Sequence, residues 1–187
     1  MDKVFLDKLK NSTPVYQQID KFEDADDELR EIASYIKKHT QHNEYVEPNR
    51  IKYLYTDKPK KDGSRYSLFD MIKRNDMEKM IDGQYDFILT IFYDVWKDLE
   101  PEQKIISLDK ALCAIDMGTM ENPKISKKAP DSKEYTANMK FYGADKVMNI
   151  SETVDLACQR IIEERKEQLK EMRQGNKKNK HATQELT

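Results

Sequence analysis

The chain has 187 residues, of which 37% are apolar and 36% charged, so its apolar share lies below the soluble average and its charged share above it. Such a length accommodates one domain with helical extensions. Ten Tyr, six Phe and one Trp exclude a wholly disordered chain. The formal net charge of −2 argues against a nucleic-acid binder held by phosphate contacts, and equally against an acidic nucleic-acid mimic.

The N-terminus lacks the apolar core of a signal peptide, and no apolar run is long enough to span a bilayer. We therefore expect a soluble, intracellular protein. The two cysteines, Cys113 and Cys158, lie in segments with helical periodicity, where we expect them to be buried thiols.

The first half of the chain predicts two helices and a strand. Residues 24–39 place apolar side chains at i, i+3, i+4 and i+7, with acids at the start and bases at the end, which indicates an amphipathic helix. Residues 51–56 alternate in side-chain character and are rich in strand-forming residues, so they predict a strand. Residues 57–64 predict an exposed loop or hairpin turn. Residues 67–80 predict a helix that stops near Gly83.

The second half begins with the most apolar stretch, residues 86–93, which predicts a central strand followed by a short turn around Trp96. Pro101 begins a predicted helix that runs to residue 115. Residues 118–130 predict a polar loop and residues 138–142 a short strand. A last helix is predicted from Ser151, and it becomes almost wholly charged from residue 163.

Two runs in the middle of the chain carry a family resemblance. Residues 85–104 read Tyr-Asp-Phe-Ile-Leu-Thr-Ile-Phe-Tyr-Asp-Val-Trp-Lys-Asp-Leu-Glu-Pro-Glu-Gln-Lys, and residues 108–114 read Leu-Asp-Lys-Ala-Leu-Cys-Ala. Together they resemble the metallopeptidases that many bacteriophages encode. The earlier Arg-Ile-Lys-Tyr-Leu-Tyr, residues 50–55, is similar to the first strand of that family. The resemblance covers residues 50–115 well and the C-terminal half poorly.

The resemblance implies a zinc site whose residues are replaced here. The family helix carries an H-E-x-x-H motif, in which two histidines one turn apart bind zinc and the glutamate polarises the metal-bound water. The matching positions are Lys110, Ala111 and Ala114, which supply neither imidazole nor carboxylate. The third histidine of the family has its best counterpart near residues 144–145, again without a histidine. We therefore expect a degenerate member with no metal, no cofactor and no enzyme activity.

Other arrangements of metal-binding or nucleophilic residues are weaker. Asp109, Cys113 and Asp116 fall on nearby turns of one helix, but a lone cysteine with carboxylates is a poor zinc set. His39 and His42 lie at a helix end, where we expect a C-terminal cap. A nucleophilic cysteine would need a histidine brought to it from a distant part of the chain.

The pattern predicts an α+β fold, a small β-sheet packed by helices, with a zincin-like core without metal and a C-terminal helical extension. We divide the chain into an N-terminal helical segment at residues 1–48 and a pseudo-metallopeptidase α+β core at residues 49–150. A C-terminal helix at residues 151–174 and a disordered basic tail at residues 175–187 follow.

Two regions are candidate contact surfaces. One is a basic loop with flanking aromatics, which can bind an acidic surface or nucleic acid but is equally explained as a solvated hairpin tip: Tyr55, Lys58, Lys60, Lys61, Arg65 and Tyr66. The other is a sparse apolar stripe on the last helix, which suits a partner's groove or packing on its own domain: Ile162, Leu169 and Met172.

Loss of the zinc motif on a retained scaffold favours a binding role. The resemblance implies a phage protein, and we expect it to act in the host cytoplasm by binding and inhibiting or redirecting a host protein machine. RNA polymerase or its sigma factor is the first candidate partner. The alternatives are a nucleic-acid-binding or virion-associated phage protein, and an inhibitor of a host antiphage defence system. No membrane partner is expected.

Overall fold

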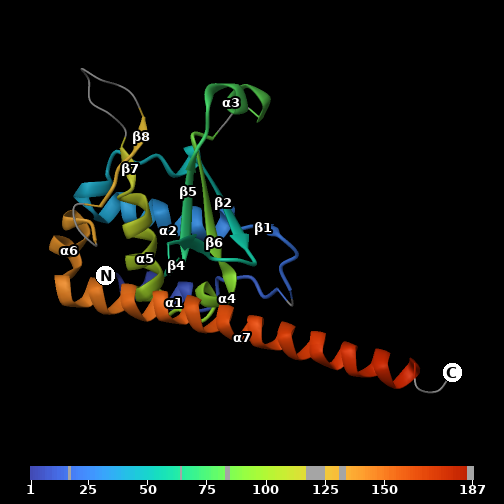
Figure 1. Cartoon of the computed structure of the whole chain (residues 1–187). Helices are drawn as coiled ribbons and strands as arrows, with labels where there is room; N and C mark the ends of the chain where they lie inside the picture. The colour runs from blue at the N-terminus through green and yellow to red at the C-terminus, as the bar shows by residue number, and fades with distance from the viewer. Residues whose placement is uncertain (17, 64, 83–84, 117–124, 131–133, 185–187) are drawn as a thin grey trace.

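A four-stranded sheet lies at the centre of the protein (Figure 1). The structure is a computed structural model that describes residues 1–16, 18–63, 65–82, 85–116, 125–130 and 134–184. The strand order is β1-β2-β6-β5, with β2 and β6 parallel and both outer strands antiparallel to their neighbours. The bounds are β1 Phe22–Asp24, β2 Ile51–Thr56, β6 Phe87–Phe92 and β5 Phe69–Lys73.

The two central strands are those that the sequence predicted. In β2 the side chains of Ile51, Tyr53 and Tyr55 are buried, and β6 alternates in the same way. Buried and more exposed side chains alternate along such a strand, because successive side chains point to opposite faces of a sheet. The predictions of strands at 51–56 and 86–93 are confirmed.

Two helices close the core against this sheet. In α2 (Asp26–His39) the predicted apolar face is fully buried. In α5 (Pro101–Leu112) Pro101 stands in the first turn, as predicted, and Glu100 and Gln103 form a capping box. Ahead of these elements lies α1 (Lys3–Leu9), and α2 is followed by short 3-10 turns η1 (Gln41–Asn43) and η2 (Pro48–Arg50). The mixed α+β fold is therefore confirmed.

The prediction of one helix at residues 67–80 is wrong. The segment forms β5 and, after a break, the short α3 (Asp76–Asp82). The backbone of this segment pairs with β6, since the Phe92 N–H donates to the Leu68 carbonyl and the Arg74 N–H to the Asp86 carbonyl. Pairing along a central strand overrides the helical spacing of the apolar residues, which does not distinguish the two structures over so short a run.

Two further small sheets and the C-terminal helices complete the structure. Lys60–Asp62 (β3) and Arg65–Ser67 (β4) form the hairpin predicted around Gly63, and Ile115–Asp116 (β7) pairs with Ser126–Lys127 (β8). Tyr93–Trp96 forms the single-turn α4. Of the predicted loop, residues 118–124 lie outside the described residues, and Ser126–Lys127 forms the short strand β8 and not a loop.

The C-terminal part is more helical than the sequence predicted. Thr136–Tyr142 is helix α6 where a strand was predicted, and Ala144–Gln184 is the single helix α7. Residues 175–184, expected to be a disordered tail, belong to α7, whose C-terminal half extends beyond the rest of the chain (Figure 1). The last three residues of the predicted tail lie outside the described residues.

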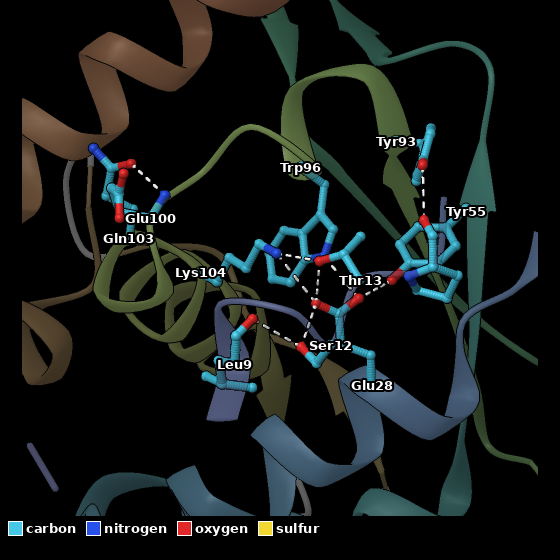
Figure 2. Close-up of polar contacts among 11 residues, drawn as sticks. Leu9, Ser12, Thr13, Glu28, Tyr55, Tyr93, Trp96, Glu100, Gln103 and Lys104 are labelled. Carbon is cyan, nitrogen blue, oxygen red and sulfur yellow. Dashed lines mark hydrogen bonds and ion pairs between the residues drawn. The ribbon is translucent and has the colours of Figure 1, made fainter. Parts of the chain in front are cut away.

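A buried polar network joins the N-terminal segment, α2, β2 and α5 (Figure 2). The Glu28 carboxylate, 5% exposed, accepts hydrogen bonds from Tyr55 Oη and Trp96 Nε1. The hydroxyls of Ser12 and Thr13 also donate to it, and the Lys104 ammonium lies 3.3 Å from Oε1. This network fixes Glu28 and Lys104 in the interior as a hydrogen-bonded ion pair.

Both cysteines are buried and neither forms a disulfide, as expected. Burial raises the pKa of the Cys158 thiol to about 12. Within the part of the chain that the structure describes, no helix is both long and apolar enough to cross a membrane.

Candidate functional site

A groove of about 590 Å³ lies between the edge strand β5 and helix α5. Its floor is formed by Lys110 and Ala111 of α5 and by Ala114 in the turn that follows this helix. One wall is β5 with the residues before it, and the opposite walls are residues 127–130 and the face of α7 that carries Ser151, Val154 and Asp155. The three positions at which the resemblance implies a zinc motif therefore share one hollow.

Lys110 is tied to the walls of this groove by two polar contacts. Its Nζ lies 2.8 Å from Glu134 Oε1 and donates a hydrogen bond to Ser151 Oγ at 3.0 Å. Glu134 is 6% exposed, and the Lys110 ammonium is a counterion of its buried carboxylate. The cation of Lys110 thus lies where the floor meets the wall formed by α7.

The donor set of the groove does not fit a zinc ion. Zinc in proteins is bound by cysteine, histidine and carboxylate ligands, and none of the described residues that line this groove is a histidine or a cysteine. An ammonium group offers no lone pair, and the methyl groups of Ala111 and Ala114 offer no donor atom. Of the lining carboxylates, Asp70 is paired with Lys60 at 2.7 Å.

The pair of Ser151 and Lys110 is also unsuited to nucleophilic catalysis. A serine nucleophile must pass its proton to a neutral base. Here the lysine is the donor to the Ser151 hydroxyl, and the same ammonium is ion-paired with Glu134. The contact is therefore a link between α5 and α7, and it joins the floor of the groove to one of its walls.

Asp155, one helical turn after Ser151, also faces the groove. Burial raises the pKa of its carboxyl, the Lys110 ammonium opposes that shift, and the Glu134 carboxylate adds to it. The ionised form of Asp155 is therefore destabilised in the folded protein. A cationic or hydrogen-bonding group placed beside the carboxylate would reduce this destabilisation.

The edge of β5 directs backbone groups towards the groove. Leu68 and Arg74 bond to β6, so the alternation of an antiparallel pair turns the backbone groups of Phe69 and Met71 outward. Two lysines bridge this edge to the facing segment: Lys127 Nζ donates to the Met71 carbonyl, and Lys73 Nζ donates to the Ile125 carbonyl. The wall is thus a strand edge held by lysine side chains and not by a further strand.

The groove is lined by lysine side chains together with apolar side chains. Lysines outnumber carboxylates along its lining even when Glu134 is counted: Lys60, Lys110, Lys127 and Lys128 against Asp70, Glu134 and Asp155. Leu68, Met71 and Val154 are buried beside them. Such a lining complements a segment with apolar and acidic side chains.

The predicted basic loop is divided by the structure. Tyr55 is fully buried against Glu28, so it does not belong to an exposed surface. Lys60 lines the groove, whereas Lys58 and Lys61 are exposed on the hairpin. Arg65 and Tyr66 line a neighbouring hollow of about 320 Å³ against α7, where Tyr66 Oη accepts a hydrogen bond from Lys166.

The predicted stripe on the last helix is only partly exposed. Ile162 is half-buried, whereas Leu169 and Met172 are 54% and 65% exposed. The latter two line a hollow of about 490 Å³ next to Thr56 and Asp57. Arg165 fixes the helix there, since its guanidinium donates to the Asp57 carbonyl at 2.6 Å and pairs with Asp94.

The expectation that both His39 and His42 cap a helix is right for only one of them. His39 Nδ1 lies 2.8 Å from the Tyr35 carbonyl in the last turn of α2. His42 Nε2 instead lies 2.8 Å from Asp109 Oδ2 on α5. Sequence reasoning also missed Glu134, Ser151 and Asp155; the spacing of Ser151 and Asp155, one turn apart on one helix, was a signal that they share a face.

Comparison with known sequences identifies the family. Residues 20–177 match the family described as "Putative phage metallopeptidase". The chain belongs to this family. The match includes α6 and most of α7, well beyond the segment 50–115 in which the resemblance is visible by eye. No curated protein and no solved structure matches the chain.

Membership of the phage metallopeptidase family gives the groove its context. A peptidase of this family would need a metal and a water-activating group, and the groove of this chain offers Lys110, Ala111 and Ala114 on its floor. Family membership therefore establishes a metallopeptidase-like phage protein, while the residues of the groove determine what it can do.

Proposed function

We propose that this protein is a non-catalytic member of the phage metallopeptidase family that binds an extended segment of a host protein in the groove between β5 and α5. The observation that carries the proposal is the Lys110–Glu134–Ser151 contact, which puts an ion-paired ammonium on the groove floor. A groove with this floor can hold a peptide, but Lys110, Ala111 and Ala114 supply neither the imidazole ligands nor the glutamate with which a metallopeptidase activates water.

The edge of β5 supports an extended ligand. Outward backbone groups of a strand bind a peptide by adding it to the sheet, and pockets beside the strand select alternate side chains. The Lys127 ammonium on the part-buried Met71 carbonyl is a contact that a peptide N–H can replace. The lysine excess favours a segment with an acidic residue near Lys127 and Lys128.

Binding of this kind would inhibit or redirect the host machine that supplies the segment, in the host cytoplasm. RNA polymerase or its sigma factor is the first partner to test. A host antiphage defence protein is the second. The hairpin gives little support to a nucleic-acid role, because Lys60 is paired with Asp70 and Lys58 lies 3.8 Å from Asp57.

The first experiment is affinity purification from a host lysate with two variants at matched apolar positions. Ala114→Arg places a long side chain in the groove, whereas Met80→Arg changes an exposed residue of α3 outside it. We expect one stoichiometric partner that wild type and Met80→Arg retain and Ala114→Arg loses. Absence of a partner, or a partner retained by Ala114→Arg, would exclude the groove as the binding site.

Two further assays test the class of function. An unstructured protein substrate incubated with zinc and the wild-type protein should remain uncleaved; cleavage that Lys110→Ala alters would show an enzyme. DNA and RNA binding should be weak and insensitive to salt. An affinity that falls steeply between low and physiological salt would favour the nucleic-acid-binding alternative instead.

A further inference from the structure

A second cluster of metal-binding side chains lies on a neighbouring face of α5. Asp109 and Cys113 are one turn apart, with the same spacing as Lys110 and Ala114 but rotated by about 100° around the helix axis. His42, from η1, approaches this face, and its Nε2 lies 2.8 Å from Asp109 Oδ2. The ligand atoms of His42, Asp109 and Cys113 all lie within 4.8 Å of one another.

These three donors are those that zinc prefers. Imidazole nitrogen, thiolate sulfur and carboxylate oxygen bind zinc at roughly 2.0–2.3 Å, and the sulfur selects against magnesium and calcium. His42 Nε2 and Asp109 Oδ2 lie 2.8 Å apart, which is a hydrogen-bond distance, and zinc would replace this contact by two metal–ligand bonds. Cys113 Sγ lies within 4.8 Å of both atoms and would move towards them to complete three ligands.

The surroundings of Asp109 resemble the outer shell of a metal site. Asp109 is 0% exposed, and Asn43 Nδ2 donates to its Oδ1 at 2.6 Å and lies 3.6 Å from Cys113 Sγ. Asn138 Nδ2 donates to Asp109 Oδ2 at 2.8 Å. Hydrogen-bonded amides of this kind orient a ligating carboxylate.

Asn138 provides an independent sign that this site suits a ligand. Its side chain is 0% exposed, and its Oδ1 has no hydrogen-bond partner among the described residues. An unsatisfied buried carbonyl costs about 1–3 kcal/mol, and a cation or its bound water beside Asp109 would satisfy it. A hollow of about 200 Å³, lined by His42, Asn43 and Cys113, gives an ion access to the cluster.

We propose that His42, Asp109 and Cys113 bind one zinc ion, with a water from the adjoining hollow as the fourth ligand. The set differs from the one that the sequence suggested, because exposed Asp116 on β7 pairs with Ser126 and His42 takes its place. The site joins η1 to α5 and is separate from the groove, so it does not depend on the proposed function.

Cobalt binding followed by absorbance tests the site directly, because a cobalt–thiolate bond adds a charge-transfer band in the near ultraviolet. Full-length protein should bind one equivalent of Co²⁺, which Zn²⁺ displaces. Cys113→Ser should abolish the band, and His42→Gln should weaken binding at least about tenfold. The matched controls Cys158→Ser and His39→Gln replace the other buried thiol and the neighbouring histidine, and both should bind as wild type does.

The remaining outcomes separate this proposal from the proposed function. Binding that is absent, or equal in Cys113→Ser and Cys158→Ser, would overturn the zinc site and leave the groove unaffected. An ion lost in Glu134→Gln but kept in His42→Gln would place the metal in the groove, and would contradict both proposals. Fluorescence of Trp96 verifies that each variant is folded, so a lost site is not mistaken for a lost fold.

Discussion

Replacing Glu28 by Gln tests whether the buried network determines the stability of the fold. The substitution keeps the shape of the side chain and removes its charge, so the Lys104 ammonium, 3% exposed, loses its counterion. Removing one partner of a buried ion pair costs about 3–5 kcal/mol. A domain of this size is stable by about 5–15 kcal/mol, so we expect a folded but much less stable protein.

Replacing the other partner of the ion pair, Lys104, should lower the free energy of unfolding by a smaller amount. In Lys104→Met the Glu28 carboxylate keeps hydrogen bonds from Tyr55, Trp96 and Thr13. We expect a loss of about 1–3 kcal/mol, the cost of one missing partner at a buried polar group. The double variant Glu28→Gln/Lys104→Met should cost less than the sum of the single changes, with a coupling of about 0.5–3 kcal/mol.

Urea unfolding followed by the fluorescence of Trp96, the single tryptophan, measures all three variants. Glu102→Gln is the matched control on the same helix, because it breaks the Glu102–Lys146 pair, whose side chains are 44% and 43% exposed. An exposed pair contributes about 0–1 kcal/mol. The reasoning is refuted if Glu28→Gln costs no more than Glu102→Gln, or if the two buried changes are additive.

Three further predictions concern single residues. Because burial raises the pKa of Asp155, the native carboxyl holds its proton to higher pH than the unfolded one, so stability falls as pH rises from the ordinary aspartate value to the raised one. Asp155→Asn should therefore be more stable than wild type at neutral pH and equal to it below that window, as measured by urea unfolding at several pH values. With its pKa raised to about 12 by burial, Cys158 should not react with a disulfide reagent at pH 8 until urea unfolds the protein; fast labelling in the native Cys113→Ser variant would contradict this. Gly143 has φ +93 with open space around it, so Gly143→Ala should cost about 1–3 kcal/mol through backbone strain alone, and an unchanged melting temperature would disprove that origin.

Local patterns predicted the elements that are long or strongly periodic. The face of α2 and the strands β2 and β6 follow from spacing alone, because their buried side chains repeat with the period of a helix or a strand. The segment of β5 has too few residues for its period to be distinctive, and its conformation is decided by pairing with β6. The short α6 was missed for the same reason.

The candidate sites depend on contacts between distant parts of the chain. His42 is 67 positions from Asp109, and Lys110 is 41 positions from Ser151. No local pattern links such residues, so the sequence indicated the floor of the groove and not its walls. The family match reaches residue 177 and shows that the C-terminal helices belong to the same scaffold.

The length of helix α7 sets a fixed distance between two surfaces of this small protein. It has 41 residues, which corresponds to about 60 Å at roughly 1.5 Å per residue. Ser151 lines the groove. Met172, in the C-terminal half of α7, lines the hollow beside Thr56 and Asp57, about 30 Å further along the same helix. A partner that contacts both places gains the avidity of a bivalent ligand, with no flexible linker to order. On the proposed function, a partner that carries both a groove-binding segment and a second contact at this distance would bind more tightly than one that carries the segment alone.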